Sequence, residues 1–119
     1  MKNVKKILLI MCALFLVILI GCGKNYDVFA QCLTDNGVKF YGAYWCPHCQ
    51  NQKNLFGSSF NNVNYIECSL PEKSGQNELC NQENIKKYPT WEFADGNRVE
   101  DVIPLKELSR LSGCSLEAE

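Results

Sequence analysis

The chain has 119 residues, with 12 Lys and Arg against 13 Asp and Glu, so its formal net charge is −1 at pH 7. This length is enough for one domain and not for two. Because basic residues do not outnumber acidic ones, the composition excludes the basic surface that nucleic-acid binding requires.

The N-terminal residues have the layout of a secretory signal. A short basic segment, residues 1–6, precedes residues 7–20, an apolar run without a charged side chain. This run is shorter than the roughly 20 residues that a membrane-spanning helix needs. The pattern therefore predicts a signal peptide, with an uncleaved signal anchor as the alternative.

The apolar run ends at Leu19-Ile20-Gly21-Cys22, which resembles the box of bacterial lipoproteins. The resemblance implies a signal peptide of residues 1–21 and a lipid on Cys22, the first residue of the mature chain. An ordinary signal peptide that happens to contain a cysteine is the alternative. We therefore expect an extracytoplasmic protein that is anchored to a membrane.

Loss of the signal changes the charge. Removing Lys2, Lys5 and Lys6 from the 12 basic residues leaves 9 against 13 acidic ones. No cationic patch for anionic lipid remains, so we expect membrane contact to come from the lipid and no partner to be a nucleic acid.

The chain has eight cysteines. Cys12 lies in the predicted signal and Cys22 is assigned to the lipid, so six cysteines remain. An even number of cysteines in a chain expected to leave the cytoplasm fits an oxidising compartment. Cys46 and Cys49 pair by their spacing, whereas the other four allow three pairings that spacing cannot separate. These four are Cys32, Cys68, Cys80 and Cys114.

A zinc site is the competing use of these cysteines. Such a site usually takes four ligands, often as two close pairs. Only Cys46 and Cys49 form a close pair, and His48 is the one histidine. The spacing therefore predicts no metal.

The mature chain begins with a short tether, residues 22–25, and continues into one predicted domain, residues 26–114. Apolar residues at helical spacing predict a first helix over residues 26–35. Residues 38–43 predict a buried strand, and residues 47–56 predict the next helix.

A second strand is predicted over residues 63–68, followed by a polar loop over residues 71–76 and a helix over residues 77–87. Between the second helix and this strand, a turn is predicted at residues 61–62. The side chains expected to point inward from the helix are Leu79, Cys80 and Ile85.

Residues 90–94 and 98–103 predict two strands joined by a tight turn at residues 95–96. A last helix is predicted over residues 104–111, and residues 115–119 form a tail. Strands joined through a helix pair in parallel with a right-handed crossover. We therefore expect an α/β fold, a mixed four-stranded sheet with a parallel pair, an antiparallel hairpin and helices on both faces.

The stretch Trp45-Cys46-Pro47-His48-Cys49 carries the chemistry. A cysteine at a helix N-terminus faces unpaired N–H groups and the positive end of the helix dipole, which stabilise a thiolate. Cys46 is therefore predicted to attack and Cys49, one turn later, to resolve, with no cofactor beyond their disulfide. Pro47 suits the first turn, and His48 is predicted to stabilise the thiolate and so make the disulfide more oxidising.

This order of elements, with Cys-x-x-Cys between the first strand and its helix, resembles the thioredoxin fold. A second motif, Tyr88-Pro89-Thr90 before the third predicted strand, supports the resemblance. It implies that Pro89 is cis and that residues 88–90 face the substrate. A trans proline that merely ends the preceding helix is the alternative. Trp45 is expected on the rim of the active site.

Finer motifs resemble the thioredoxin-like domain of bacterial and plastid vitamin K epoxide reductase homologues. The motifs are Tyr41-Gly-Ala-Tyr-Trp-Cys-Pro-His-Cys49, Tyr65-Ile-Glu-Cys68, Leu79-Cys80, Tyr88-Pro-Thr-Trp91 and the leucines of residues 105–113. The resemblance implies a quinone-linked membrane partner that reoxidises the dithiol. It also implies a second disulfide, Cys68–Cys80, which would stabilise the domain; a redox relay is the alternative role.

Three features depart from these families. The related domains often have Gly where Asp101 stands, near the rim of the active site. Phe40 stands where many thioredoxins have a buried acid, so no such base is assigned. Cys32 and Cys114 are outside the pattern; they could pair with each other or remain buried thiols.

The predicted function is a membrane-tethered thiol–disulfide oxidoreductase that oxidises the cysteines of exported proteins. One alternative is a thiol reductant in cytochrome c maturation or disulfide repair, which a lower redox potential would indicate. A second is a non-catalytic thioredoxin-like binding lipoprotein.

Overall fold

The computed structural model describes residues 1–18 and 24–117. The predicted lipid site Cys22, and the predicted cleavage point before it, lie outside the described residues. The basic and apolar N-terminal residues form one helix, α1 (Lys2–Ile18), and residues 2–15 of this helix are exposed. Within the described part of the chain, no helix combines the length and the apolarity that a membrane crossing requires.

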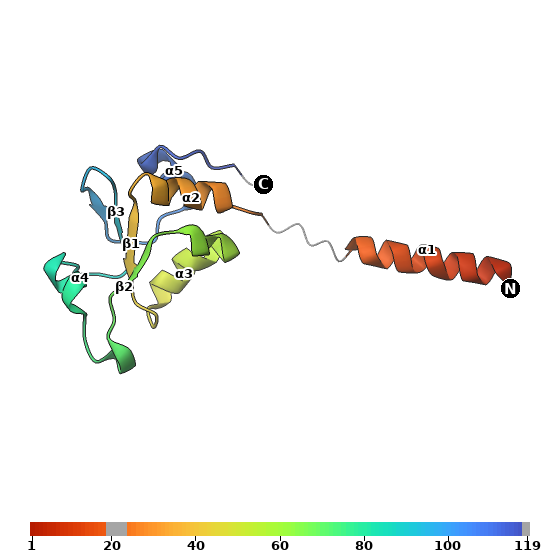
Figure 1. The fold of residues 1–119 in the computed structure, drawn as a ribbon, viewed down its shortest axis with the longest axis horizontal. Helices are drawn as coiled ribbons and strands as arrows, with labels where there is room; N and C mark the ends of the chain where they lie inside the picture. The colour runs from red at the N-terminus through yellow and green to blue at the C-terminus, as the bar shows by residue number, and fades with distance from the viewer. Residues whose placement is uncertain (19–23, 118–119) are drawn as a thin grey trace.

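A mixed sheet of four strands organises residues 24–117, in the order β2-β1-β3-β4 (Figure 1). The strands are β1 (Lys39–Gly42), β2 (Tyr65–Glu67), β3 (Thr90–Glu92) and β4 (Arg98–Val99). β1 runs parallel to β2 and antiparallel to β3, and β3 pairs antiparallel with β4. The predicted parallel pair and antiparallel hairpin are therefore confirmed.

Helices lie between and around these strands. They are α2 (Asp27–Asp35), α3 (Pro47–Phe56), α4 (Glu78–Gln82) and α5 (Leu105–Ser112). Two short 3-10 helices, η1 (Gly57–Asn62) and η2 (Pro71–Lys73), complete the fold. η1 replaces the simple turn predicted at residues 61–62, and η2 lies in the predicted loop of residues 71–76.

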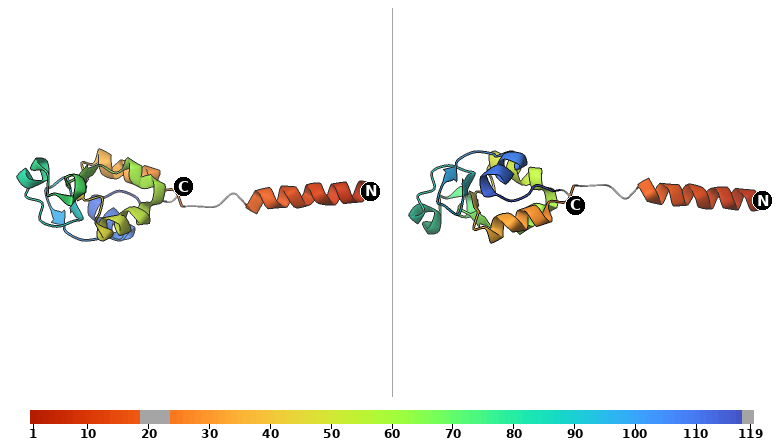
Figure 2. Two further views of the ribbon diagram at one scale, coloured as in Figure 1. Left: turned by 90° about the horizontal axis from the view of Figure 1, so that it is seen from below. Right: turned by 90° about the horizontal axis from the view of Figure 1, so that it is seen from above.

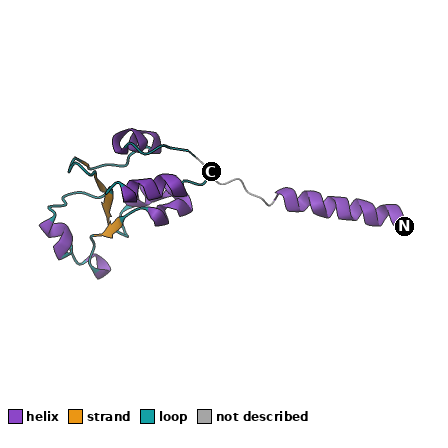
Figure 3. Cartoon of the chain, turned by 45° about the horizontal axis from the view of Figure 1, so that its top comes forward, coloured by secondary structure: helices purple, strands orange, loops and turns teal. Residues whose placement is uncertain are grey.

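The two faces of the sheet are covered by different helices. Neighbouring strand residues point to opposite faces, and Phe40 and Tyr41 on β1 accordingly lie in different apolar clusters. The cluster of Phe40 includes residues of α2, α3 and α5, whereas that of Tyr41 includes Cys80 of α4. Figure 3 shows α4 and α5 on different sides of the strands, and both views of Figure 2 show α4 far from α2 and α3.

The helix predicted over residues 77–87 is much shorter in the structure. α4 begins correctly, because the Asn77 side chain caps it by accepting a hydrogen bond from the N–H of Cys80 at 3.0 Å. It ends at Gln82, and Asn84 has a φ of 60°, which interrupts the helix. Leu79 is 51 % exposed, so its predicted inward orientation is wrong, whereas Cys80 and Ile85 are buried.

The strand predicted over residues 98–103 is also shorter, because only Arg98 and Val99 pair with β3. Further along, the N–H of Ile103 donates to the side-chain oxygen of Gln52 at 2.7 Å. Gln52 lies on α3 and is completely buried. A side chain of the active-site helix thus takes the hydrogen bond that a longer strand would have used.

Candidate active site

Cys46 and Cys49 lie where β1 has ended and α3 begins. Cys46 is the N-cap residue of α3, and its Sγ accepts a hydrogen bond from the backbone N–H of Cys49 at 3.4 Å. Their exposed fractions are 6 % and 1 %, so Cys46 is the more accessible of the two. Both are thiols in this structure. The arrangement provides an outer thiol that a substrate can reach and an inner thiol that it cannot.

The two residues between the cysteines both belong to the first turn of α3. Pro47 lacks an N–H at a position where an N–H would have no helical partner. Pro47 and His48 are exposed. Any positive charge on the imidazole of His48 therefore adds to the positive end of the α3 dipole beside Cys46.

Cys49 strongly favours its neutral form. Burial, opposed in part by a hydrogen bond to the backbone of Ala43 and reinforced by the neighbouring Cys46, raises the pKa of the Cys49 thiol to about 12. At neutral pH this sulfur is therefore a thiol, and it must lose a proton before it can attack a disulfide.

The motif of residues 88–90 lies directly beside the dithiol. The peptide bond between Tyr88 and Pro89 is cis, and the Cys46 thiol donates to the carbonyl oxygen of Tyr88 at 3.6 Å. Pro89 is buried, and the Thr90 hydroxyl donates to the carbonyl oxygen of Lys87 at 2.7 Å. The backbone of Tyr88 is thus the part of this motif that lies at the sulfur.

Aromatic side chains form a rim beside the dithiol. The ring of Trp45 packs edge-on against Tyr88 at a centroid distance of 6.0 Å, and its Nε1–H donates to the Ser69 hydroxyl at 2.8 Å. The Lys73 ammonium lies 5.6 Å from the centre of the Trp45 ring, and the Lys73 N–H donates to the Tyr44 hydroxyl at 3.2 Å. The segment after β2 therefore holds this rim in place.

No protein-family model matches the chain. The chain is 39 % identical over 93 residues to the thiol-disulfide oxidoreductase LTO1 of Arabidopsis thaliana, a match that covers 74 % of the chain and 24 % of that protein. It is 36 % identical over 61 residues to the protein disulfide-isomerase A5 of Bos taurus, which covers 47 % and 12 %. The chain thus spans a quarter or less of the length of these curated relatives. The thioredoxin O2 structure from Arabidopsis thaliana in its oxidized state aligns with 75 % of the chain and 90 % of that structure, at 19 % identity and a TM-score of 0.42.

The sheet order, the dithiol at the start of α3 and the cis proline before β3 together form the thioredoxin arrangement. The chain has a thioredoxin-like fold. Its two further cysteine pairs are disulfides in the structure. Cys68 and Cys80 join the end of β2 to α4, and Cys32 and Cys114 join α2 to the segment after α5. Spacing alone could not select these pairings.

One acidic residue of the thioredoxin-like site was not predicted. The Glu67 carboxylate accepts hydrogen bonds from the N–H of Tyr44 at 3.2 Å and the N–H of Ser69 at 2.8 Å. Glu67 ends β2 and pairs in register with Gly42, which ends β1. Because parallel strands bring their carboxyl ends to the same edge, a polar residue at the end of the second strand was a usable signal.

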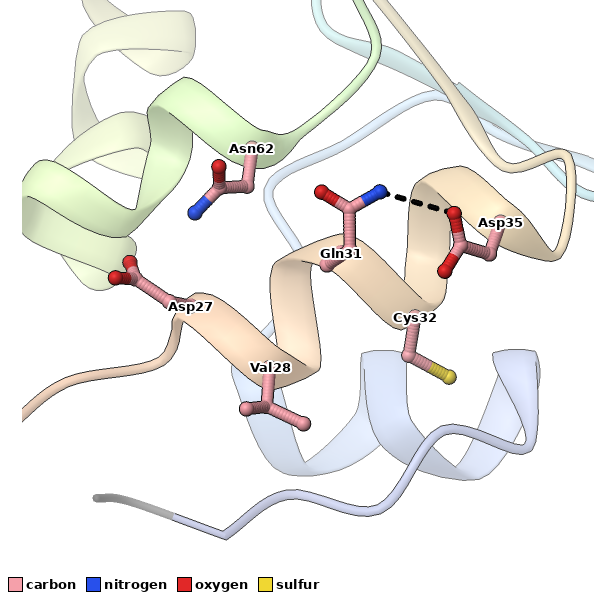
Figure 4. Close-up of a pocket in the computed structure, with 6 residues that line it drawn as sticks. All are labelled: Asp27, Val28, Gln31, Cys32, Asp35 and Asn62. Atoms are coloured by element: carbon pink, nitrogen blue, oxygen red, sulfur yellow. Dashed lines mark hydrogen bonds between the residues drawn. The ribbon is translucent and has the colours of Figure 1, made fainter.

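A surface pocket of about 430 Å³ lies along α2, away from the dithiol. Its lining residues, drawn in Figure 4, are Asp27, Val28, Gln31, Cys32, Asp35 and Asn62. Gln31 and Asp35 hydrogen bond to each other at 2.9 Å. Among residues 1–18 and 24–117, no group of three or more His, Cys, Asp or Glu side chains is placed to hold a metal ion.

Proposed function

We propose that this chain is a protein thiol–disulfide oxidoreductase that oxidises the cysteines of exported proteins through Cys46 and Cys49. The observation that carries the proposal is the position of Cys46. Its sulfur is the N-cap of α3, lies 3.6 Å from the carbonyl oxygen of Tyr88, and has the buried Cys49 one turn behind it. The similarity to a thiol-disulfide oxidoreductase supports the same chemistry.

Oxidation of a substrate proceeds by two exchanges. A substrate thiolate attacks Cys46 Sγ of the disulfide, the bond between the two sulfurs breaks, and Cys49 leaves with the electron pair and takes up a proton. A second substrate thiolate then attacks the substrate sulfur of the mixed disulfide and displaces Cys46 as a thiolate. The substrate gains one disulfide, and the Cys46–Cys49 pair is reduced by two electrons.

Substrate binding is assigned to the backbone and rim beside Cys46. The carbonyl oxygen of Tyr88 accepts a hydrogen bond from the Cys46 thiol in the free protein, so an incoming chain can replace that donor. The exposed Trp45 and Tyr44 offer apolar contact to the same chain. Pro89 and Thr90 hold this segment at the start of β3.

The oxidising direction rests on the dipeptide between the thiols. The α3 dipole and His48 stabilise the Cys46 thiolate, which stabilises the reduced form and raises the potential of the disulfide. The two other disulfides, Cys68–Cys80 and Cys32–Cys114, suit an oxidising compartment.

The cellular setting is proposed from the N-terminal sequence and the finer resemblance. Residues 1–21 act as a lipoprotein signal and Cys22 carries the lipid that holds the domain at a membrane, outside the cytoplasm. A quinone-linked membrane reductase of the vitamin K epoxide reductase-like kind takes the electrons. Palmitate labelling of the intact protein, with Cys22→Ala as the control, tests the anchor; no label on the unmodified chain contradicts it.

The equilibrium potential of Cys46–Cys49 against glutathione is the deciding experiment. We expect a value well above the roughly −270 mV of a reducing thioredoxin and in the range of about −180 to −120 mV typical of oxidants. A value near −270 mV, in the range of a reducing thioredoxin, would instead indicate a reductant. Substrates trapped as mixed disulfides on Cys49→Ala, but not on a variant that also carries Cys46→Ala, would exclude a purely non-catalytic role.

A further inference from the structure

The buried Cys49 thiol lies on α3, and β1, the strand that leads to it, carries no acid that could accept its proton. β1 consists of Lys39, Phe40, Tyr41 and Gly42, and Phe40 packs among aromatic rings of the core. Yet Cys49 must become a thiolate each time the disulfide closes, and it is 1 % exposed. The proton acceptor has to come from another element.

Gly42 opens a path from this thiol to β2. A side chain at Gly42 would place its Cβ 3.1 Å from Cys49 Sγ and 3.0 Å from Cε2 of Tyr65, closer than ordinary van der Waals contact. The sulfur, the ring edge of Tyr65 and, at 3.0 Å, Cε1 of Phe40 therefore surround the same point, and a side chain at residue 42 would occupy it. The Cε2 atom neighbours the carbon that bears the hydroxyl of Tyr65.

The hydroxyl of Tyr65 leads to a carboxylate. It donates to Oε2 of Glu67 at 2.5 Å. The other carboxylate oxygen of Glu67 is held by the backbone N–H groups of Tyr44 and Ser69, at 3.2 and 2.8 Å. Both residues are half-buried. The carboxylate is thus fixed at the strand edge, with one oxygen committed to the backbone and one to the phenol.

The charged and titratable groups around this pair come from α3 and from the segment before β3. On α3, the Lys53 ammonium lies 4.0 Å from the centre of the Tyr65 ring. Cys49 on α3 and Cys46 at its N-cap are close enough to Tyr65 to act on it electrostatically. Tyr88, before β3, is near Glu67 and both thiols. Burial, and then the hydrogen bond to Glu67, raises the pKa of Tyr65, so its phenol stays neutral and can pass a proton on without ionising.

We propose that Tyr65 and Glu67 form the route by which the Cys49 thiol loses its proton when the disulfide closes, in place of a buried acid on β1. This inference rests on the proposed function, because it assigns a step of the same exchange. Tyr65 is the group beside the sulfur, and Glu67 acts through Tyr65.

The step balances as follows. The Cys49 proton passes to the Tyr65 oxygen, directly or through a water molecule, while the Tyr65 proton passes to the Glu67 carboxylate. The Cys49 thiolate attacks Cys46 Sγ of a mixed disulfide, a sulfur–sulfur bond forms between the two cysteines, and the bond from Cys46 to the outer sulfur breaks. The outer sulfur leaves with the electron pair, and Glu67 later returns its proton to solvent.

The test separates the two thiols in time. The full chain carries Cys12→Ser and Cys22→Ser. Limited reduction then leaves Cys46 and Cys49 as the two thiols and keeps the other two disulfides intact, which the mass after alkylation checks. Reaction with the aromatic disulfide of thionitrobenzoate then releases one thionitrobenzoate when Cys46 attacks and a second when Cys49 closes the ring. Tyr65→Phe and Glu67→Gln should slow the second release at least about tenfold at pH 7 and leave the first within about twofold.

The pH profile distinguishes proton transfer from a change of shape. In Tyr65→Phe the second release should become proportional to hydroxide concentration between about pH 6 and 9, whereas the unsubstituted protein should show a flatter profile. Glu67→Asp should recover part of the rate that Glu67→Gln loses. Tyr26→Phe and Glu78→Gln, which remove a phenol and a carboxylate elsewhere, serve as matched controls.

Each outcome has a separate meaning. If the rate of the second release is unchanged in both variants, the route is overturned. It is also overturned if the rates of both releases fall equally and the pH profile is unaltered, because Glu67 would then only support the loop. If the unsubstituted protein releases no second thionitrobenzoate, Cys46 and Cys49 do not close a disulfide, and it is the proposed function that fails.

Discussion

His48 and Glu67 reach the same site in different ways, one through the sequence and one through the pairing of strands. His48 lies between the two cysteines along the chain, so the effect predicted for it on Cys46 follows from sequence and helix geometry alone. Glu67 is far from them in sequence and reaches the site only because β2 lies beside β1 in register. Adjacency along the chain is visible in a sequence, whereas adjacency across a sheet depends on pairing.

The contribution of His48 can be measured as a potential. His48→Gln replaces the imidazole beside the α3 N-terminus by an uncharged polar side chain. We expect the Cys46–Cys49 potential to fall by about 30 mV, which corresponds to a tenfold change in the exchange equilibrium. Equilibration with glutathione measures it, with the exposed Gln50→Ala as the control. An equal potential in all three proteins would show that His48 does not tune the dithiol.

At the scale of elements, the buried amide of Gln52 connects α3 to two other segments. Its oxygen accepts hydrogen bonds from Trp91 Nε1 of β3 at 3.1 Å and from the N–H of Ile103 at 2.7 Å, and its nitrogen donates to the carbonyl oxygen of Ile103 at 3.0 Å. This one side chain therefore fixes the active-site helix against the strand that follows the cis proline.

Replacing this amide should destabilise the whole domain. Gln52→Leu leaves the buried polar groups of Trp91 and Ile103 without partners, and each unsatisfied group costs about 1–3 kcal/mol. We expect the free energy of unfolding to fall by about 2–4 kcal/mol in a urea titration. Gln50→Leu, on the exposed side of α3, is the matched control. A loss no greater than that of the control would contradict the role of Gln52.

Glu92 on β3 connects three strands. Its carboxylate lies 3.2 Å from Lys39 Nζ on β1 and 2.5 Å from Arg98 Nη2 on β4. Burial raises the pKa of Glu92, but hydrogen bonds from Arg98 and Lys39 outweigh burial and leave it below its ordinary value of 4.5. The ionised form is therefore the one that stabilises the sheet.

The pH dependence follows from that sign. A carboxyl group whose pKa is lowered on folding stabilises the protein when the pH is above its ordinary pKa. This stabilisation is lost as the pH falls through the pKa of the group in the folded protein. Glu92→Gln should therefore lower the free energy of unfolding by about 1–2 kcal/mol at pH 7. The difference from the unsubstituted protein should shrink as the pH falls below 4.5. A difference that is constant with pH would point to packing rather than charge.

At the scale of the whole molecule, two disulfides join parts of the chain that the sheet alone does not connect. Cys32–Cys114 spans 82 residues and ties the segment after α5 to α2, whereas Cys68–Cys80 spans 12 residues and ties α4 to β2. In the chain-entropy account, the longer loop restricts the unfolded chain more. The two bonds should therefore differ in their effect on stability.

Removing each bond separately tests that difference. Cys32→Ala with Cys114→Ala should lower the free energy of unfolding by about 4–5 kcal/mol, and Cys68→Ala with Cys80→Ala by about 3 kcal/mol. Urea titrations of both double variants at one pH give the comparison. An equal or reversed order would show that packing around the bonds, rather than loop length, decides their contribution.

Local signals were enough for the elements with strong patterns. The helix over residues 47–56 was predicted with the bounds that the structure gives, because Pro47 and Gly57 mark its ends. Local signals failed at residues 77–87 and 98–103. Asn84 adopts a left-handed conformation that interrupts the helix, and the N–H of Ile103 bonds to the Gln52 side chain rather than to a neighbouring strand. Neither feature can be recognised from the local sequence.

The sequence by itself determined the dithiol, the helix that begins at it, the proline motif of residues 88–90 and the fold class, because each depends on spacing or local conformation. Only the tertiary structure decided that Cys32 pairs with Cys114, that the ring edge of Tyr65 lies near Cys49, and that the Tyr65 hydroxyl bonds to Glu67. These depend on which strands are neighbours and in what register. β1 has no carboxylate, whereas β2 carries Glu67, which reaches Tyr65 through a hydrogen bond.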